Sequence, residues 1–546
     1  MDSFKSLKRR ATDLVQSLPQ SLPAMPAMPN LGRGGKGHGH HSMKGTWEKI
    51  SVPTLPRSSH SVDIVSGTVY IFGGEIEPRK PVDNDMHAVT LPSSGAQADY
   101  YAIKAKPAGS VSKPQQEEGK ADKGKAKDEG PELGSVPSPR VGHATAVIGH
   151  RIFLFGGRGG PDMTPLEENG RVWVFDSRSR SWSYLDPVLP VAPQSSSSSG
   201  PPVPPARSFH SAIATEKPDD LTPHPAHHQS HHPRPVPDSW RDWAKGDSDQ
   251  VGIPQRPIVG SVAERATDPD ADGYGTFIIH GGCLSDGTRT NDLWAFDVAS
   301  RVWQRLPDAP GKPRGGTALA LSKSRLYRFG GFNGENEEGG QLDYLELVTE
   351  SFHDAYVSGG GEQEVAVSAR HNPGWQSFLQ GRENVGYKEV DPAEKPLTVG
   401  EKEEEEAWPG ARSVASLEAI TVGGGREYLV LMLGERDPSE DGGHNGAGKF
   451  WDDVWVFQVP SQHMTAASLT DGLLSAVGRK SGEGRWYKVE TGPYDDEDDA
   501  SLPGPGPRGW IASGTMGELE ENGIVIWGGL DSGNKRLGDG WIFRLG

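Results

Sequence analysis

Six arginine residues are the most regular feature of this sequence that could do chemistry. Each precedes an apolar block that ends in glycine: Arg57, Arg140, Arg207, Arg314, Arg412 and Arg508. The arginine lies 16 residues before the first glycine in copies one, two and four, and 74, 22 and 20 residues before it in copies three, five and six. A guanidinium pairs bidentately with a carboxylate. Six that converged would favour an acidic ligand; the alternative is that each arginine only bonds carbonyls of neighbouring repeat units.

Other candidate chemistry is sparse. The string Glu440-Asp441-Gly442-Gly443-His444 could supply two or three oxygen and nitrogen ligands, so Glu440 and His444 are weak candidates for a metal site. Five histidines between His224 and His232 lie among prolines, which favours incidental loop composition over metal binding. The sequence contains no Gly-x-Ser-x-Gly string, phosphate-binding loop or paired-cysteine zinc motif. We therefore expect no catalytic residue and no cofactor.

The glycine blocks belong to a repeat of four predicted strands. The blocks are Val69–Gly74, Ile152–Gly157, Phe277–Gly282, Leu326–Gly331, Leu429–Gly434 and Ile524–Gly529. In the fifth, Glu435 stands where the second glycine is expected. An aromatic strand follows, with Trp173, Trp294, Trp455 and Trp541, and Tyr344 as a weaker fourth copy; a second aromatic comes later, as in Trp182 and Trp303. Apolar, β-branched segments punctuated by glycine predict short strands.

Ring closure follows from how the last repeat ends. A lone four-stranded sheet of this kind leaves apolar faces bare, and packing six around an axis buries them. The sixth repeat stops at Gly546 after its third strand, and Gly45–Ile50, which contains Trp47, can supply the fourth. We predict an all-β fold, a six-bladed propeller closed by an N-terminal strand.

The repeat resembles the kelch motif of the galactose oxidase and kelch-like superfamily. The resemblance rests on an arginine, then a histidine (His60, His143 and His210), then a Gly-Gly strand end and two spaced aromatics. It implies a β-propeller in which the first strand of each blade lines the central channel. It also implies that the six arginines form a ring at one mouth, where partner peptides bind. Thr317, Ala415 and Ile511 replace the histidine in the last three copies, and the first lacks an aromatic in its third strand.

Composition narrows the class of protein. Lys plus Arg is 56 and Asp plus Glu is 74 over 546 residues, for a net charge of −18. Such an acidic chain is a poor candidate for sequence-independent nucleic-acid binding. The single cysteine, Cys283, rules out an internal disulfide and favours the cytoplasm. No apolar run of about 18 residues is present, so no transmembrane segment is expected, and prolines interrupt the N-terminal region where a signal peptide would have its apolar core.

The chain divides into a tail, 1–44, and the propeller, 45–546. The first 18 residues form a candidate short amphipathic helix for weak membrane contact or partner docking; the alternative is a frayed tail or a helix packed on the propeller. Disordered insertions are expected at about 104–135, 187–205, 217–272, 383–410 and 493–506. Acidic runs at 403–406 and 495–499 could fold over the mouth and compete with an acidic partner, or form solvated linkers.

Two functions follow from these expectations. The first is a non-enzymatic protein-interaction module or scaffold that binds another protein, through an acidic peptide, at the arginine mouth. The alternative is a metal-dependent enzyme at the same mouth, similar to the plant specifier lyases or to galactose oxidase. The Glu-x-x-x-Asp-x-x-x-His iron string of the specifier proteins does not occur in this sequence, and Cys283 has no evident partner set of Tyr and His.

Overall fold

The structure is a computed structural model whose described residues form one ring of small sheets. They are 43–92, 97–109, 134–189, 201–216, 275–352, 364–370, 374–381, 408–423, 425–439, 448–461, 482–494, 504–520 and 522–546. The chain divides into two compact units, Met1–His41 and Ser42–Gly546, and every described residue belongs to the second. The predicted N-terminal helix therefore lies outside the described residues.

Each of six blades is a four-stranded antiparallel meander, as predicted. Blade one holds β2 (Ser61–Val65), β3 (Thr68–Phe72), β6 (Met86–Thr90) and β7 (Asp99–Ile103), and blade two holds β8 (Ala144–Ile148), β9 (Arg151–Phe155), β12 (Val172–Asp176) and β13 (Ser181–Leu185). Blade three holds β15 (Ser211–Thr215), β16 (Thr276–Leu284), β17 (Arg289–Asp297) and β18 (Val302–Leu306), and blade four holds β19 (Ala318–Ser322), β20 (Arg325–Phe329), β21 (Gln341–Phe352) and β23 (Gln376–Leu379). Blade five holds β24 (Ser416–Val422), β25 (Arg426–Met432), β28 (Val454–Gln458) and β29 (Trp486–Pro493), and blade six holds β30 (Ala512–Thr515), β31 (Gly523–Trp527), β32 (Gly540–Leu545) and β1 (Met43–Ile50).

Short elements decorate this frame. Small ladders follow the Gly-Gly strand ends: β4 (Glu75–Glu77) with β5 (Lys80–Pro81), β10 (Arg158–Gly159) with β11 (Thr164–Pro165), and β26 (Glu435–Asp437) with β27 (Lys449–Phe450). Strand β14 (Arg207–Ser208) extends blade three, β22 (Glu364–Ala369) pairs with the long β21, and a 3₁₀ turn spans Gly517–Leu519.

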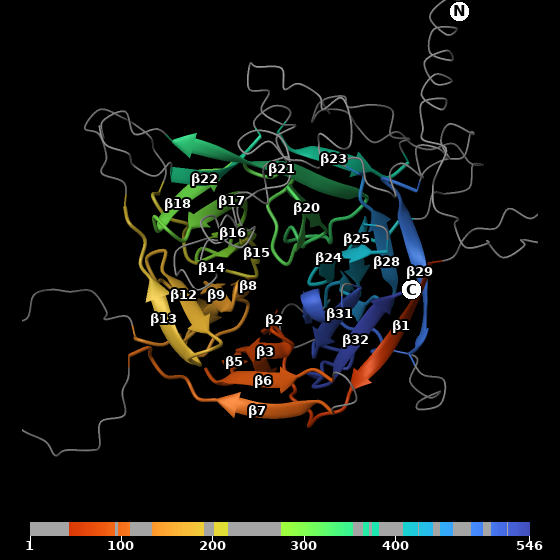
Figure 1. The fold of residues 1–546 in the computed structure, drawn as a ribbon, viewed down its shortest axis with the longest axis horizontal. Helices are drawn as coiled ribbons and strands as arrows, with labels where there is room; N and C mark the ends of the chain where they lie inside the picture. Colours follow the sequence, from red (N-terminus) through yellow and green to blue (C-terminus); the bar gives the residue numbers. More distant parts are fainter. Residues whose placement is uncertain are drawn as a thin grey trace, which may run out of the picture. The chain divides into compact units, whose positions relative to one another are not determined.

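The six blades close into a ring. Their innermost strands are β2, β8, β15, β19, β24 and β30, and each contacts the next one along the chain, with β30 contacting β2. Figure 1 shows the blades following one another around a common centre, from red through green to blue. The predicted six-bladed propeller is thus confirmed, with the first strand of every blade on the inside.

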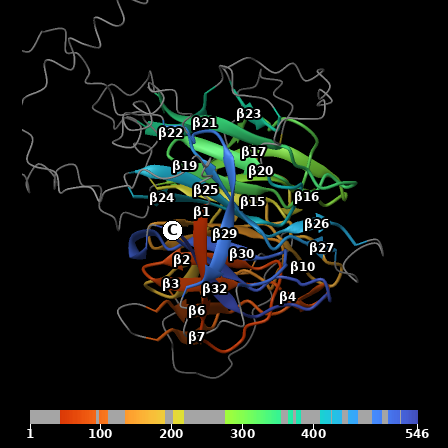
Figure 2. The ribbon, with the colours of Figure 1, turned by 90° about the vertical axis from the view of Figure 1, so that its right-hand side faces the viewer.

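The N-terminal strand seals the ring, as the sequence predicted. Strand β1 pairs antiparallel with β32, from Gly45 opposite Leu545 to Ile50 opposite Gly540. It also pairs in parallel with β29 of blade five, so one strand covers two sheet edges at once. Figure 2 shows β1 lying beside β29 and β32. Trp47 is only 4% exposed, and its ring centre lies 5.0 Å from that of Phe543.

Six apolar clusters hold the blades together, one between each neighbouring pair. Side chains alternate along a strand, so each sheet has two apolar faces. In β9, Ile152 and Leu154 pack toward blade one, whereas Phe153 and Phe155 pack toward blade three. Each cluster contains at least one aromatic from a fourth strand or from the residue just before it: Trp182, Trp303, Trp375, Trp486, Trp47 and, in blade one, Tyr100.

The fifth repeat has a register different from the one expected. Leu433, with φ of 60°, occupies the first glycine position, and Gly434, with φ of 103°, occupies the second. The Gly434 N–H donates to the carbonyl of Arg508 at 2.9 Å, as every other second glycine does to the next blade. The first glycine is therefore the one replaced, and Glu435 follows the pair; the sequence-based alignment of this copy was wrong by one residue.

The fourth repeat is also shifted by one residue. Leu154, two residues before the first glycine of blade two, pairs with Trp173, and its equivalent in blade four, Arg328, pairs with Asp343. Asp343, not Tyr344, thus replaces the third-strand tryptophan. A buried ion pair of Arg328 with Asp343 takes the place of an aromatic contact there. Because the sequence-based alignment looked for an aromatic residue in the third strand, it selected the neighbouring tyrosine.

Most residues of the five expected insertions lie outside the described residues. The described parts are 104–109, 134–135, 187–189, 201–205, 408–410, 493–494 and 504–506. In the first insertion, residues 104–109 run along the edge of blade two. The main-chain N–H of Trp182, on β13, donates to the Lys106 carbonyl at 2.9 Å, and the Trp182 carbonyl accepts from the Ala108 N–H at 2.7 Å. Main-chain hydrogen bonds to the edge of blade two thus hold this stretch.

Replacing Trp47 by alanine tests the closure. Removing a buried tryptophan costs about 3–5 kcal/mol, so Trp47→Ala should lower the free energy of unfolding in urea by about that amount. Leu189→Ala is the control, because Leu189 is 57% exposed and surface changes stay within about 0.5 kcal/mol. Equal losses for the two variants would contradict the sealing role of β1.

Candidate functional site

The six predicted arginines lie at equivalent positions at one end of the ring, but each is enclosed in its own blade. Their side chains are buried, with exposed fractions of 0–6%. Each Nη1 donates to the carbonyl at the first glycine position of its own blade, at 2.9–3.3 Å: Gly73, Gly156, Gly281, Gly330, Leu433 and Gly528. The guanidiniums therefore fix the strand ends from within.

Carboxylates neutralise most of these buried cations. In blade three Arg207 makes a bidentate pair with Asp292, at 2.6 and 2.9 Å, and Trp294 Nε1 donates to the same carboxylate at 2.8 Å. Blades five and six repeat this arrangement with Asp453 and Asp539. The sequence analysis missed these acids, although an Asp-x-Trp spacing marks all three.

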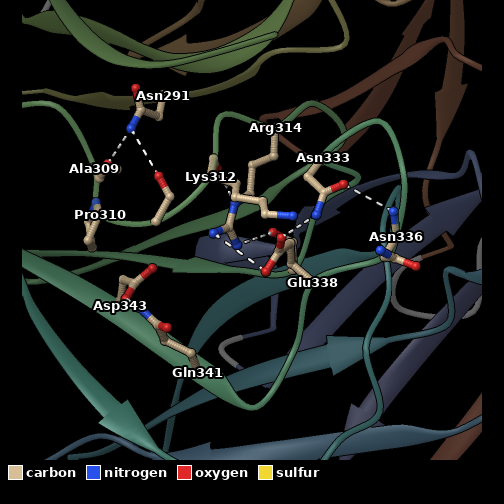
Figure 3. Close-up of polar contacts among 12 residues, drawn as sticks. Asn291, Ala309, Pro310, Lys312, Arg314, Asn333, Asn336, Glu338, Gln341 and Asp343 are labelled. Atoms are coloured by element: carbon tan, nitrogen blue, oxygen red, sulfur yellow. Dashed lines mark hydrogen bonds and ion pairs between the residues drawn. The ribbon is translucent and has the colours of Figure 1, made fainter. Parts of the chain in front are cut away.

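In the remaining three blades the arginine has a different partner. Arg140 pairs with Glu168, which also accepts from the indole of Trp173. In blade four Arg314 lies 3.8 Å from Glu338, and Figure 3 shows this pair beside Lys312 and Asn333. In blade one the partner is a histidine, because Arg57 Nη2 lies 3.2 Å from His87 Nε2. Buried guanidiniums with these contacts support the structural alternative; direct binding of a partner by them stays a prediction.

The main chain of the arginines joins neighbouring blades. The N–H of each second glycine donates to the carbonyl of the arginine in the next blade, at 2.8–3.0 Å, and Gly529 closes the cycle onto Arg57. The arginines therefore join neighbouring blades through their main-chain carbonyls, whereas their side chains bond carbonyls of their own blades and not of the neighbouring blades, as the structural alternative had it.

A second closed cycle of hydrogen bonds encircles the axis at this mouth. Its members follow each arginine by two residues, and each N–H donates to the carbonyl of the preceding member at 2.7–3.2 Å: Ser59, Gly142, Phe209, Gly316, Val414 and Trp510. All six have φ between 45° and 63°. Left-handed backbone costs a non-glycine residue roughly 1–2 kcal/mol, so the cycle compensates strain at four positions. Phe209 and Trp510 meet edge to face above it, with ring centres 5.2 Å apart, and we call this set the hub.

A hollow opens beside the hub, between blades one, two and three. It is lined by Ser59, Glu75, Arg79, Val141, Arg158, Met163 and Phe209. Arg158 lies over the Phe209 ring, 4.7 Å from its centre, and donates to Ser208 Oγ at 3.0 and 2.7 Å. Glu75 is already paired with Arg536 at 2.7 Å. This side of the mouth is positively charged.

Blades four and five give the same mouth an acidic side. Burial raises the pKa of Glu337 to about 8, and the neighbouring charges of Glu435 and Asp437 add to the shift. Burial likewise raises the pKa of Glu435 to about 7, while a hydrogen bond from Trp510 opposes the shift. Both carboxyls are therefore partly protonated near neutral pH.

A second pair of acids lies among the inner strands. Burial raises the pKa of Asp63, on β2, to about 7, and the nearby Glu418 charge contributes. Burial raises the pKa of Glu418, on β24, to about 7 as well, against a hydrogen bond from Ser513 Oγ at 2.6 Å. Both carboxyls bridge neighbouring blades, since Asp63 accepts from Thr145 of β8 and Ser513 belongs to β30.

No metal centre is evident in the described part of the chain. Within it, no group of three or more His, Cys, Asp and Glu side chains is placed to hold a metal ion. The weak candidates Glu440 and His444 lie outside the described residues, as do the histidines at 224–232.

The comparisons with known proteins agree with this architecture. The kelch-motif family model matches residues 139–188, which run from the end of one Pro-rich connection through all of blade two. This is a kelch-repeat protein. A curated relative, the N-(sulfonatooxy)prop-2-enimidothioate sulfolyase of Thlaspi arvense, is 21% identical over 92% of this chain and 98% of its own length.

Two further relatives match the kelch propeller over shorter stretches. Tip elongation aberrant proteins 1 and 3 of Schizosaccharomyces pombe are 26% and 28% identical, over 27% and 26% of this chain and 10% and 12% of their own lengths. The solved structure of YjhT covers 90% of this chain and 95% of its own, with a TM-score of 0.44 and 12% identity, a similarity too weak to support an argument.

Arg207→Ala tests the structural role of the kelch arginines. Breaking a buried ion pair by removing one partner costs about 3–5 kcal/mol, because the other charge stays buried. Arg305→Ala is the matched control from the same blade: Arg305 also makes a bidentate pair with an aspartate, Asp308, but is 49% exposed, and such pairs contribute at most about 1 kcal/mol. Urea unfolding measures both losses. Equal stability of Arg207→Ala and the wild type would contradict the structural role of Arg207 and favour a role in ligand binding.

Asp63→Asn tests the inner acid. Because the native pKa of Asp63 lies above its ordinary value of 3.8, at about 7, the native state retains a proton that the unfolded chain loses, and this group destabilises the fold as pH rises from about 4 to 7. Asparagine removes that effect. The variant should gain stability relative to the wild type between pH 5 and pH 8, by at most about 1.4 kcal/mol for each unit of pKa shift. Asp162→Asn, at an exposed position, is the control for the substitution itself.

Proposed function

We propose that this kelch propeller is a non-enzymatic protein-interaction module or scaffold in the cytoplasm, and that it binds a partner protein at the mouth around the hub. The observation that carries this proposal is the hub itself. Closed by main-chain hydrogen bonds and topped by Phe209 and Trp510, it presents a preformed floor that loops from several blades surround. Rigid scaffolds with functional loops at one end are a common basis of binding.

The arginines have an indirect part in this proposal. Each holds a strand end from which a mouth loop departs, because its Nη1 bonds the first glycine position and its carbonyl bonds the preceding blade. We assign partner contact to the loops that follow the glycines, and support of those loops to Arg57, Arg140, Arg207, Arg314, Arg412 and Arg508.

Two hypotheses from the sequence stay predictions. The competition of the acidic runs at 403–406 and 495–499 with a partner, and the membrane contact or docking by the first 18 residues, concern segments outside the described residues. Among the residues that the structure describes, no helix is long and apolar enough to cross a membrane.

A lyase acting at the same mouth is the second candidate. It is favoured by the Thlaspi arvense sulfolyase, whose similarity extends over nearly the full length of both chains. Metal analysis of the purified protein separates the two functions: stoichiometric iron together with turnover of the relative's named substrate supports the lyase. A protein that carries no bound iron and leaves that substrate unchanged supports the binding module.

Affinity purification with a mouth variant tests the binding function. Ile76 and Glu335 are exposed side chains of mouth loops in blades one and four, so Ile76→Asp/Glu335→Lys should reduce recovery of specific partners at least about fivefold while leaving the fold intact. Arg301→Glu is the control, because Arg301 lies at the β17–β18 turn, at the other end of the blade. Equal loss in both variants, or in neither, would place the partner site away from the mouth.

A further inference from the structure

Two guanidiniums line the hollow beside the hub and are not matched by carboxylates there. Glu75 is the acid of this hollow, and its carboxylate is taken up by Arg536 at 2.7 Å and by the Arg79 N–H at 2.8 Å. The Arg79 side chain is exposed and makes no hydrogen bond or ion pair with any residue that the structure describes. Arg158 donates from Nε and Nη2 to the uncharged Ser208 hydroxyl, and its Nη1 makes no hydrogen bond with any residue that the structure describes.

The Arg158 cation is poorly solvated, so an anion close to it would stabilise its charged form. Burial lowers the pKa of Arg158, and the neighbouring Arg79 charge lowers it further, against the opposing effects of Cys283 and Glu75. Phe209 and Met163 form an apolar wall of the hollow, and a less polar environment makes ionic attraction stronger than in open water. This positive hollow belongs to a chain with a net charge of −18, so it is a local exception to the overall charge.

The geometry points to a carboxylate of a bound peptide segment, seated in this hollow between the guanidiniums of Arg79 and Arg158. This inference rests on the proposed function and adds the class of partner and the residues that recognise it. The fork of a guanidinium matches the two oxygens of a carboxylate, and the polar residue Ser59 lines the same hollow. The acidic ligand expected from the sequence is thus assigned to two residues that were not among its six candidates.

Charge complementarity also orients the peptide. The opposite side of the mouth carries the buried carboxyls of Glu337 and Glu435, which are partly protonated at neutral pH and repel an acidic group increasingly as pH rises through about 7 to 8. A segment laid across the hub therefore places its acidic end over blades one and two. Its other end then lies over blades four and five.

Peptide selection tests the inference. A phage library of random 12-residue peptides, displayed with both ends blocked, is selected on the wild type, on Arg79→Glu, on Arg158→Gln and on Arg301→Glu. Arg301 is a matched control, because it is an exposed arginine that shares the left-handed backbone of Arg79, with φ of 58° against 61°. We expect enrichment of Asp or Glu with the wild type and with Arg301→Glu. Synthetic copies of the enriched peptides should bind Arg79→Glu at least about tenfold more weakly, and a rise in salt should weaken wild-type binding.

Further arms separate the alternatives. Selected peptides synthesised with a free or an amidated C-terminus tell a side-chain carboxylate from a terminal one, and thermal unfolding verifies that Arg158→Gln is folded. Wild-type peptides without acidic enrichment, or peptides that bind Arg79→Glu within about twofold of the wild type, overturn the inference and leave the proposed function standing. A wild type that captures protein partners but no peptide also overturns it. A wild type that captures neither removes the proposed function as well.

Discussion

Mutual burial of sheet faces around a closed circle is the constraint on which this molecule depends. Each blade has two apolar faces because side chains alternate along its strands, and neither face can be covered from within the blade. Only neighbours on both sides remove both faces from water, so an open row of blades would leave its two end faces exposed. Strand β1 solves this problem by completing blade six from the other end of the chain, and its second pairing with β29 covers another sheet edge.

Buried polar groups fix how neighbouring blades are placed against each other. The six arginines stand where one blade meets the next, and Asp or Glu carboxylates compensate their charges; in blade one Asp83 supplies the negative charge, and His87 lies between it and Arg57. A buried cation without such a partner would cost several kcal/mol, which is why the acid two residues before the third-strand tryptophan recurs. The two main-chain cycles then fix the distance between blades. Apolar packing supplies most of the stability, and these hydrogen bonds define the sixfold geometry.

The mouth combines rigidity with unequal charge. The hub cycle holds four non-glycine residues in left-handed conformation, which persists only where surrounding structure enforces it. Around this rigid centre the loops differ from blade to blade: guanidiniums near blades one and two, and protonatable carboxyls near blades four and five. The features that all six blades share thus form the hub, and the loop residues that differ between blades give the mouth its uneven charge.

The sequence by itself determined the fold of this protein. Spacing of arginines, glycine pairs and aromatics indicated six blades, and the unfinished sixth repeat indicated closure by Trp47. These features are local or periodic, so they are visible along one dimension. The strand register of repeats four and five was not visible in the sequence. Asp343 is explained only by Arg328 opposite it, and Leu433 only by the bond that the next residue makes to the neighbouring blade.

The tertiary structure alone decided what the arginines do. Their partners Glu168, Asp292, Asp453 and Asp539 lie 28 to 85 residues away in sequence, and whether a guanidinium faces solvent or its own blade depends on that pairing. The hollow of Arg79 and Arg158 likewise arises where three blades meet. Charge and spacing can nominate an acidic ligand, but only the folded chain shows which cations are already compensated and which remain for a partner.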